Sequence, residues 1–253
     1  MTDRFRLDGQ VAVVTAGGRG IGRGIALCLA EAGADVVVTS RTQADLDEVV
    51  ARVEAFGRRG LGLTGDATRA GDMAAVAEMA VERFGKLTLW VNNAGGQPDN
   101  LQRPFSEVSQ ANFDAQLALN LGSVWAGVRA AQAHMIAGSI INISSRAART
   151  TSHSGHGLYA AAKAAVNNLT ATLGAEMGPS IRVNAVAPGP VLTETFYETM
   201  GLTPDEAQAR LPGFGIPLQR FGQPEDIGDA VVFLASPAAS WISGQCLWVT
   251  GGA

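Results

Sequence analysis

The sequence predicts an α/β fold in which one doubly wound, mostly parallel sheet of seven strands carries helices on both faces. Short β-rich runs alternate with amphipathic helical stretches, several of these runs are almost continuously apolar, and neither a linker nor an internal repeat divides the chain. Continuous apolar runs are typical of parallel strands covered on both sides. We therefore expect a single Rossmann-type domain over residues 1–253.

The expected strands are the runs richest in β-branched and apolar residues. They are Val11–Thr15, Asp35–Ser40, Gly60–Gly65, Leu87–Asn92, Ser139–Ile143, Ile181–Val186 and Cys246–Val249. Between them, apolar positions recur at helical spacing. The clearest helical stretches are Gly20–Ala32, Asp45–Phe56, Ala70–Phe84, Tyr159–Met177 and Pro224–Leu234.

The alternation of strands and helices loosens between Gly189 and Gly222. Inside this segment, Thr203, Pro204 and Glu206 form a helix-start signal: an N-cap residue, a proline at the first helical position and an acid three residues after the cap. Open α/β sheets bind ligands beyond the carboxyl ends of their strands. We therefore expect a substrate lid at about residues 190–220, with a plain surface insertion as the alternative.

Composition excludes several classes of partner. The formal charge is -4 with no basic stripe, so a nucleic-acid partner is not expected. Cys28 and Cys246 lie in apolar patterns, which favours core packing in a reducing compartment over a disulfide. Neither a signal peptide nor a membrane span is recognisable. We expect a cytoplasmic protein with no membrane partner.

The first expected strand runs into the glycine-rich stretch VTAGGRGIG, from Val14 to Gly22. A glycine-rich turn between a strand and a helix brings backbone N–H groups and a helix N-terminus to a phosphate, and a Cβ would block that approach. The dinucleotide spacing G-x-G-x-x-G does not fit here. Taken alone, such a turn serves packing as often as cofactor binding.

The stretch resembles the T-G-x-x-x-G-x-G loop of the short-chain dehydrogenase/reductase family, with Thr15, Gly20 and Gly22 at matching positions. Ala16 replaces the first glycine of that loop, and we expect its φ to stay negative while Gly17 absorbs the turn. Other family motifs follow in order across nearly the whole chain. They are GD at residues 65–66, NNAG at 92–95, YAAAK at 159–163, RVNAVAPGPVLTET at 182–195 and IPLQRFGQPEDIGDAVVFLASPAASWISGQ at 216–245.

This resemblance implies a nicotinamide cofactor held at the carboxyl edge of the sheet. The implied contacts come from the glycine loop, the ends of the second and third strands, the NNAG segment, the YAAAK pair and the P-G segment. The residues are Thr15, Gly18, Arg19, Gly20, Ile21, Gly22, Ser40, Arg41, Asp66, Ala67, Asn93, Ala94, Gly95, Tyr159, Lys163, Pro188, Gly189, Val191 and Thr193.

The end of the second strand separates NADP(H) from NAD(H). An acid there would bind the adenosine ribose and repel a 2′-phosphate, but this chain has Ser40 and Arg41. Arg41 offers a planar fork to a phosphate, and Arg19 could approach the same group. We therefore expect NADP(H). The alternative is that both arginines are solvated surface residues and the cofactor is NAD(H).

The chemistry centres on Tyr159 and Lys163, which are four residues apart and share one face of a helix. A nearby ammonium is expected to lower the pKa of Tyr159 from its ordinary value of about 10. By resemblance, Tyr159 is the general acid/base, Lys163 holds the cofactor ribose and tunes Tyr159, and Ser145 hydrogen-bonds the substrate oxygen. The resemblance also gives Asn120 a water and proton path to Lys163, although its pattern alone favours a locally satisfied helix residue.

Several features remain open from the sequence. The interval from Ser145 to Tyr159 is one residue longer than the commonest spacing in the family, and we assign the extra residue to the loop at 149–157. His153 and His156 in this loop are either solvated or in contact with substrate, and a metal site is not expected because no acid or cysteine cluster accompanies them.

Several activities fit these motifs. A small-molecule ketone or secondary alcohol is the expected substrate, and hydroxysteroid dehydrogenase, 3-oxoacyl reductase and sugar-alcohol dehydrogenase activities all fit. A nucleotide-binding sensor without turnover is the alternative from another class. The family also implies a homotetramer. Residues 168–178 and 241–253 are candidates for its contacts, or alternatively for the core.

Overall fold

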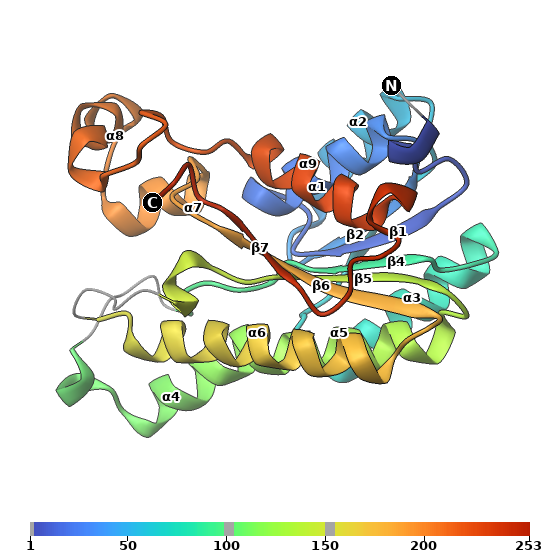
Figure 1. The fold of residues 1–253 in the computed structure, drawn as a ribbon, viewed down its shortest axis with the longest axis horizontal. Helices are drawn as coiled ribbons and strands as arrows, with labels where there is room; N and C mark the ends of the chain where they lie inside the picture. The colour runs from blue at the N-terminus through green and yellow to red at the C-terminus, as the bar shows by residue number, and fades with distance from the viewer. Residues whose placement is uncertain (1–2, 99–103, 150–154) are drawn as a thin grey trace.

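The computed structural model describes residues 3–98, 104–149 and 155–253. A parallel seven-stranded sheet lies between two layers of helices (Figure 1). The strands are β1 (Val11–Thr15), β2 (Asp35–Ser40), β3 (Gly60–Thr64), β4 (Leu89–Asn92), β5 (Gly138–Ile143), β6 (Ile181–Pro188) and β7 (Cys246–Val249). Their order is β3-β2-β1-β4-β5-β6-β7, so the topology reverses between β1 and β4. The predicted fold class is confirmed.

The helices cover both faces of the sheet. Above it in Figure 1 lie α1 (Gly20–Glu31), α2 (Gln43–Ala55) and α9 (Pro224–Ala235). Below it lie α3 (Ala70–Phe84), α4 (Gln110–Leu117), α5 (Ser123–His134) and α6 (Gly157–Glu176), with a π-helical turn over Ala118–Gly122 between α4 and α5. Two short helices, α7 (Glu194–Met200) and α8 (Pro204–Arg210), lie beyond the end of β6. In the described part of the chain, no helix combines the length and apolarity that crossing a membrane requires.

The central strands divide the core into two clusters. Val14 and Val38 pack with α1, α2 and α9, whereas Val13 and Val37 point to the opposite face and pack with α3 and α5. All four valines are fully buried. Burial of each contributes about 1.5–3 kcal/mol, and this two-sided burial explains why the strands appear in the sequence as continuous apolar runs.

Three strands, β1, β2 and β7, have the predicted bounds, and the other four differ by one or two residues at an end. Thr203 caps α8 through a reciprocal pair of hydrogen bonds with Glu206, as its sequence signal predicts. We expect Asn120 to lie on a helix but predict no bounds for the helices between β4 and β5, an interval that α4, the π turn and α5 fill. Its apolar periodicity is weakened by Gln116, Asn120 and Ser123, which the tertiary structure buries.

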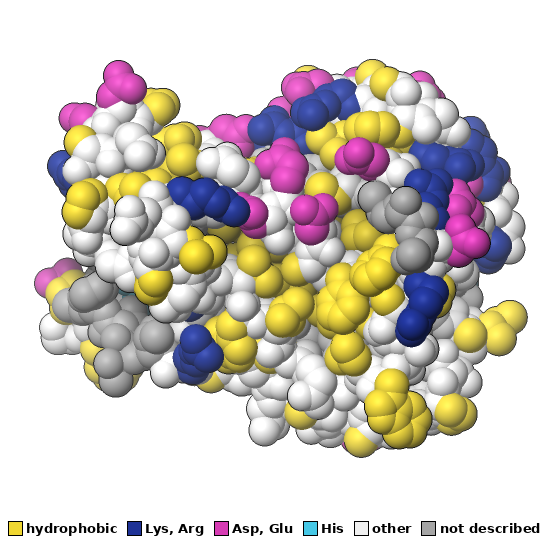
Figure 2. Space-filling view, turned by 45° about the horizontal axis from the view of Figure 1, so that its top comes forward, with side chains coloured by type: hydrophobic (Ala, Val, Ile, Leu, Met, Phe, Trp, Pro, Cys, Tyr) yellow, Lys and Arg dark blue, Asp and Glu magenta, His cyan; other side chains and the backbone are white. Residues whose placement is uncertain are grey.

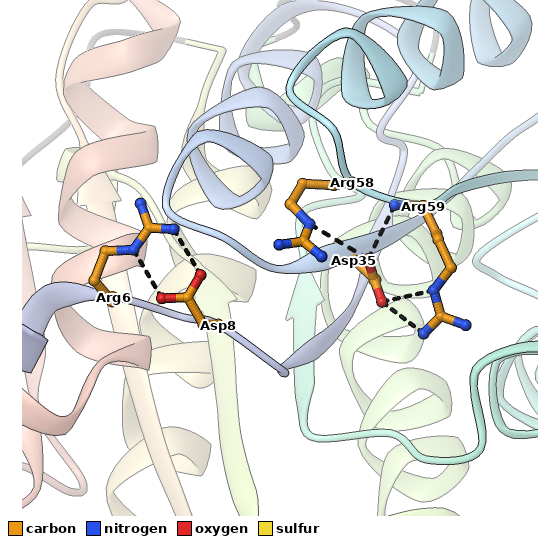
Figure 3. Close-up of polar contacts among 5 residues, drawn as sticks. All are labelled: Arg6, Asp8, Asp35, Arg58 and Arg59. Carbon is orange, nitrogen blue, oxygen red and sulfur yellow. Dashed lines mark hydrogen bonds and ion pairs between the residues drawn. The ribbon is translucent and has the colours of Figure 1, made fainter.

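Asp35 fixes the amino-terminal edge of the sheet (Figure 3). Its carboxylate accepts hydrogen bonds from the Arg59 backbone N at 2.9 Å and from Arg59 Nε and Nη2 at 2.9 and 2.6 Å. Arg58 adds an ion pair at 3.6 Å. Burial raises the pKa of Asp35, but the hydrogen bonds and the two positive charges outweigh burial and hold the pKa below its ordinary value. The start of β2 is thereby tied to the residues that enter β3.

The backbone at Ala16 corrects one expectation. Its φ is +50°, in the left-handed region, whereas Gly17 has no positive φ. Hydrogen bonds hold the chain on both sides of this turn, from Asn93 Nδ2 to the Ala16 carbonyl at 3.1 Å and from Gly17 N to the Thr39 carbonyl at 3.0 Å. The left-handed turn therefore falls on Ala16, and the prediction of a negative φ there is wrong.

We expect Ala16→Gly to raise the free energy of unfolding by about 1 kcal/mol, because glycine adopts a positive φ without the strain of a Cβ. Urea denaturation measures the change. Ala51→Gly, on the exposed face of α2, is the matched control and should lower stability by about 0.5–1 kcal/mol. A loss of stability in Ala16→Gly comparable to that of the control would contradict the strain at Ala16.

Candidate active site

The predicted site residues gather at the carboxyl edge of the sheet, at the left of Figure 1. Lys163 lies deepest, at 2% exposure on α6. Its Nζ donates a hydrogen bond to the carbonyl of Ile143 at the end of β5, at 2.8 Å. A Cβ on Gly95 would lie 2.7 Å from this Nζ and 3.0 Å from Asn120 Oδ1, so a side chain at this position would displace the ammonium. Burial lowers the pKa of Lys163 to about 8.

Tyr159 lies one helical turn before Lys163, and its ring centroid is 5.9 Å from Lys163 Nζ. The phenol hydrogen-bonds Ser145, whose Oγ also accepts from the Ala147 backbone N at 3.2 Å. Burial raises the pKa of Tyr159, and the Ser145 hydrogen bond only partly offsets the rise. The expectation that Lys163 lowers this pKa is therefore wrong for this structure, in which Nζ is hydrogen-bonded to a backbone carbonyl.

Asn120 is fully buried in the π-helical turn and clamps the chain that follows β4. Its Oδ1 accepts from Gly96 N at 2.9 Å, and its Nδ2 donates to the Gly96 carbonyl at 2.8 Å. Nδ2 also lies 3.1 Å from the Gln116 carbonyl. Asn120 is thus satisfied mainly by a distant segment rather than within its own helix. These hydrogen bonds to Gly96 could not be predicted from the sequence, because no local pattern indicates them.

Asn93 joins the NNAG segment to the glycine loop. Its Nδ2 donates to the carbonyls of Thr15 and Ala16 at 3.0 and 3.1 Å. Thr15 Oγ1 in return accepts from Asn93 N and Ala94 N at 3.0 and 3.1 Å. A Cβ on Gly22 would lie 2.2 Å from the Ala16 carbonyl oxygen, so the start of α1 packs directly on this loop. The two predicted cofactor segments form one connected unit.

The N-terminus of α1 holds a carboxylate in this structure. Glu194, the first residue of α7, accepts a hydrogen bond from the Gly20 backbone N–H and pairs with Arg23 Nη2 at 2.7 Å. Burial raises the pKa of Glu194, but these contacts outweigh it and the pKa is lowered. The carboxylate lies at the N-terminus of α1, where backbone N–H groups and the helix dipole favour an anion. Sequence reasoning missed Glu194, whose only signal was an acid directly after Thr193.

Arg41 and Asp66 meet at the carboxyl ends of β2 and β3. Asp66 Oδ1 accepts from the Thr68 backbone N and hydroxyl at 2.9 and 2.7 Å, and these bonds together with the Arg41 charge lower its pKa despite burial. A Cβ on Gly18 would lie 3.0 Å from Ser40 Oγ, so the glycine loop reaches this point. Arg19 instead pairs with Glu198 of α7, at 3.4 Å.

The P-G segment crosses from the sheet to the glycine loop. Pro188 ends β6, the Gly189 N–H bonds the Val249 carbonyl at 2.9 Å, and Val191 bridges to Gly222. Thr193 caps α7 through Phe196 N at 3.0 Å, and its Cβ lies 3.4 Å from the position of a Cβ on Gly20. The remaining predicted contacts pack on the two core clusters; they are Ile21 and Ala67.

The predicted lid segment contains α7, α8 and a cluster of aromatic rings. Phe196 lies against Phe214 and Phe221, with ring centroids 6.0 and 5.5 Å apart, and Phe214 contacts Phe221 at 5.0 Å. Next to Tyr159 lies His156, with ring centroids 6.4 Å apart. His153 lies outside the described residues. Within the described ranges, no group of three acids, histidines or cysteines is placed to hold a metal.

Comparisons with known proteins agree with this geometry. The family model described as enoyl-(acyl carrier protein) reductase matches residues 15–253. An uncharacterised oxidoreductase of Mycobacterium tuberculosis (strain CDC 1551 / Oshkosh) is 42% identical, covering 99% of this chain and 94% of that protein. Two solved structures share the fold. A 7α-hydroxysteroid dehydrogenase with NADH and 7-oxo glycochenodeoxycholic acid has a TM-score of 0.91 at 36% identity, covering 100% and 97% of the two chains. A short-chain dehydrogenase from Burkholderia cenocepacia J2315 with NADP has a TM-score of 0.87 at 33% identity, covering 98% of each.

Buried Lys163 makes stability depend on alkaline pH. Its pKa is about 8 when folded and 10.5 as the ordinary value, so the unfolded chain binds more protons between these two values. Below pH 8 Lys163 is protonated in both states, so the folded state carries the full free-energy cost of burying the charge. As the pH rises toward 10.5, folded Lys163 is neutral and this cost disappears. We expect the wild-type free energy of unfolding to rise by about 1–3 kcal/mol relative to Lys163→Met over this range.

Urea denaturation at pH 7 to 10 measures this difference between the two proteins. Lys86→Met, which alters the exposed lysine, is the matched control and should show the wild-type pH dependence. If the free energy of unfolding depends on pH in the same way in the wild type and in Lys163→Met, burial does not lower the pKa of Lys163.

Proposed function

Because the chain belongs to the short-chain dehydrogenase/reductase family, whose members act on hydroxyl and carbonyl groups with NAD(P), we propose that it is an NADP(H)-dependent oxidoreductase. Its proposed substrates are ketones and secondary alcohols, with Tyr159 as the general acid/base. The observation that carries this proposal is the half-buried Tyr159 phenol, hydrogen-bonded to Ser145 and one helical turn from Lys163. A sensor without turnover would not require this arrangement.

The residues present fit a nicotinamide cofactor, because the N-terminus of α1 accepts the Glu194 carboxylate and the packing at Gly22 and Gly95 leaves no room for a Cβ. The glycine loop would hold the phosphates, and Thr193 with the P-G segment would line the nicotinamide side. A bound nicotinamide supplies or accepts the hydride. Residues 190–220 are proposed as the substrate lid, because Thr193 places this segment against the glycine loop.

Reduction of a ketone requires a proton donor, and we assign that role to Tyr159. The raised pKa of Tyr159 keeps its phenol protonated at neutral pH, so the hydroxyl can donate its proton to a carbonyl oxygen. Ser145, next to it, can donate a second hydrogen bond to the same oxygen and stabilise the charge that develops there. Lys163 is held by the Ile143 carbonyl, which leaves its other N–H donors for the cofactor ribose or for a water.

The NADP(H) preference is proposed from Arg41, whose charge acts at the carboxyl ends of β2 and β3. No acid ends β2, so nothing at Ser40 would repel a 2′-phosphate. NAD(H)-dependent hydroxysteroid dehydrogenation is the second candidate. It is favoured by the 36% identity to the 7α-hydroxysteroid dehydrogenase, whose structure holds NADH.

A homotetramer is proposed as the assembly. Trp241 is 99% exposed beside β7, and Trp125 on α5 is 56% exposed. Figure 2 shows hydrophobic side chains gathered over the middle of one face, with acidic and basic side chains intermixed around them. Contacts between copies of this chain would bury such surface.

A cytoplasmic location is proposed because Cys28 and Cys246 are both free thiols.

Tyr159→Phe removes the proposed proton donor and keeps the ring. We expect kcat for ketone reduction to fall at least about 100-fold, with the Kd of NADPH changed less than about twofold. Nicotinamide absorbance with a panel of ketones and fluorescence titration measure the two quantities. Tyr197→Phe, the same change at the other tyrosine, should reduce kcat far less. Near-normal turnover by Tyr159→Phe would remove the mechanism.

Arg41→Gln tests the cofactor assignment. The variant should lose at least about tenfold in kcat/KM for NADPH, because a charge-assisted phosphate contact is lost, and should change little with NADH. Arg52→Gln, on the exposed surface of α2, is the matched control. A strong NADH preference in the wild-type enzyme would overturn the NADP(H) proposal while leaving the oxidoreductase assignment intact.

A further inference from the structure

A half-open cavity of about 190 Å³ lies at the amino ends of β4, β5 and β6, under the C-terminal end of α9. The catalytic residues follow the opposite, carboxyl ends of these strands. Strand β5 has six residues, so the two sites are separated by roughly 20 Å of sheet. In Figure 1 the amino ends of β5 and β6 lie at the right, away from α7 and α8. The proposed oxidoreductase mechanism does not use any of its residues.

One row of paired residues forms the floor of this cavity. Leu89, Ser139 and Arg182 are register partners on three adjacent strands, so their side chains project to the same face of the sheet. Ser139 is 2% exposed, and its Oγ has no hydrogen-bond partner within the described structure. A buried hydroxyl without a partner is unfavourable, and such a group calls for an explanation. Here it lines an open cavity that a ligand can enter.

Arg182 gives the cavity its charge. Among the described residues that line the cavity, Arg182 is the only charged one. Within the described ranges, Arg182 forms no ion pair with an acid. Nη1 and Nη2 each donate to a backbone carbonyl, of Ile242 at 3.3 Å and of Ala235 at 3.2 Å. A guanidinium has five N–H donors, so donors remain beyond these two bonds. Burial lowers the pKa of Arg182, and an anion in the cavity would oppose this effect.

The remaining wall is mixed, with the polar residues Gln10, Thr88, Ser236 and Ser240 beside an apolar part. Leu7 and Leu89 are almost completely buried on the inner side, and Ala235 and Pro237 lie nearer the mouth. The volume is about six times the ~30 Å³ that a water molecule occupies in the liquid. A ligand of this size with one anionic end and a short aliphatic end can contact Arg182 and Ser139 with the first and Leu7 and Leu89 with the second. Inorganic phosphate has no group for the apolar contacts.

We propose that this cavity binds a short-chain carboxylate. Its oxygens accept hydrogen bonds from the Ser139 hydroxyl and the Arg182 guanidinium, and its alkyl group packs on Leu7 and Leu89. Binding does not involve the glycine loop or Tyr159, so it is independent of the cofactor.

Butyrate is the probe for this proposal, measured by isothermal titration or ligand-observed NMR on the full chain. We expect millimolar binding to the wild type and at least about tenfold weaker binding by neutral butyramide and by inorganic phosphate. Ser139→Ala should weaken butyrate about tenfold, because it removes one hydrogen bond to a charged ligand. It should leave folding intact, since the hydroxyl has no partner to lose. Ser106→Ala, on an exposed 3-10 turn, is the matched control.

Arg182→Gln should abolish the binding of butyrate. If that variant fails to fold because the carbonyls of Ala235 and Ile242 lose their donor, Ser139→Ala alone decides the result. Equal affinity of Ser139→Ala and wild type would overturn the proposal and place any butyrate elsewhere, for example beside Tyr159. If butyramide binds as tightly as butyrate, the cavity does not select an anion. If phosphate binds more tightly than butyrate, the ligand is not an organic acid. No binding at all would mean that the cavity holds solvent only.

Discussion

The buried ammonium of Lys163 is the constraint on which the carboxyl edge of this protein depends. A positive charge at 2% exposure requires a partner, and the Ile143 carbonyl at 2.8 Å supplies one. That bond ties α6 to β5, together with the hydrogen bonds from Asn142 Nδ2 to Thr170 Oγ1 and from Ser144 Oγ to the Lys163 carbonyl, and Tyr159 lies beside Ser145 as a result. The same ammonium leaves no room for a side chain on Gly95, while Asn120 clamps the next residue, Gly96. Three segments from different parts of the chain are thus held by one charged group and its neighbours.

A small set of hydrogen bonds likewise holds the glycine loop, on the other side of the site. Asn93 and Ala94 donate four hydrogen bonds to Thr15 and Ala16, which join the ends of β1 and β4 at the point where the strand order reverses. The N-terminus of α1 attracts negative charge, and the Glu194 carboxylate accepts a hydrogen bond there from the Gly20 backbone N–H. Because Glu194 begins α7, the lid segment and the proposed phosphate site share one interaction. At the proposed cofactor site a phosphate would displace that carboxylate, so that the proposed cofactor binding and the position of the proposed lid would be coupled.

The two edges of the sheet differ in chemical character. At the carboxyl edge, the buried side chains of Lys163 and Asn120 are hydrogen-bonded to backbone groups of other segments, and their positions serve a proposed proton transfer. At the amino edge, Asp35 and its two arginines stabilise the entry into β2 and β3, whereas Ser139 and Arg182 face an open cavity without an acid. Parallel strands produce this division, since every loop that follows a strand emerges on one side and every loop that precedes a strand on the other.

The sequence by itself determined the α/β class, the bounds of β1, β2 and β7, the capping of α8 and the residues that converge at the carboxyl edge. These features follow from apolar periodicity, capping chemistry and ordered motifs, all of which act over a few residues. Only the tertiary structure decided the left-handed turn at Ala16, the helices between β4 and β5, the clamp of Asn120 on Gly96, the carboxylate of Glu194 at α1 and the raised pKa of Tyr159. Each of these depends on contacts between residues far apart in the chain, or on burial, and neither leaves a local pattern.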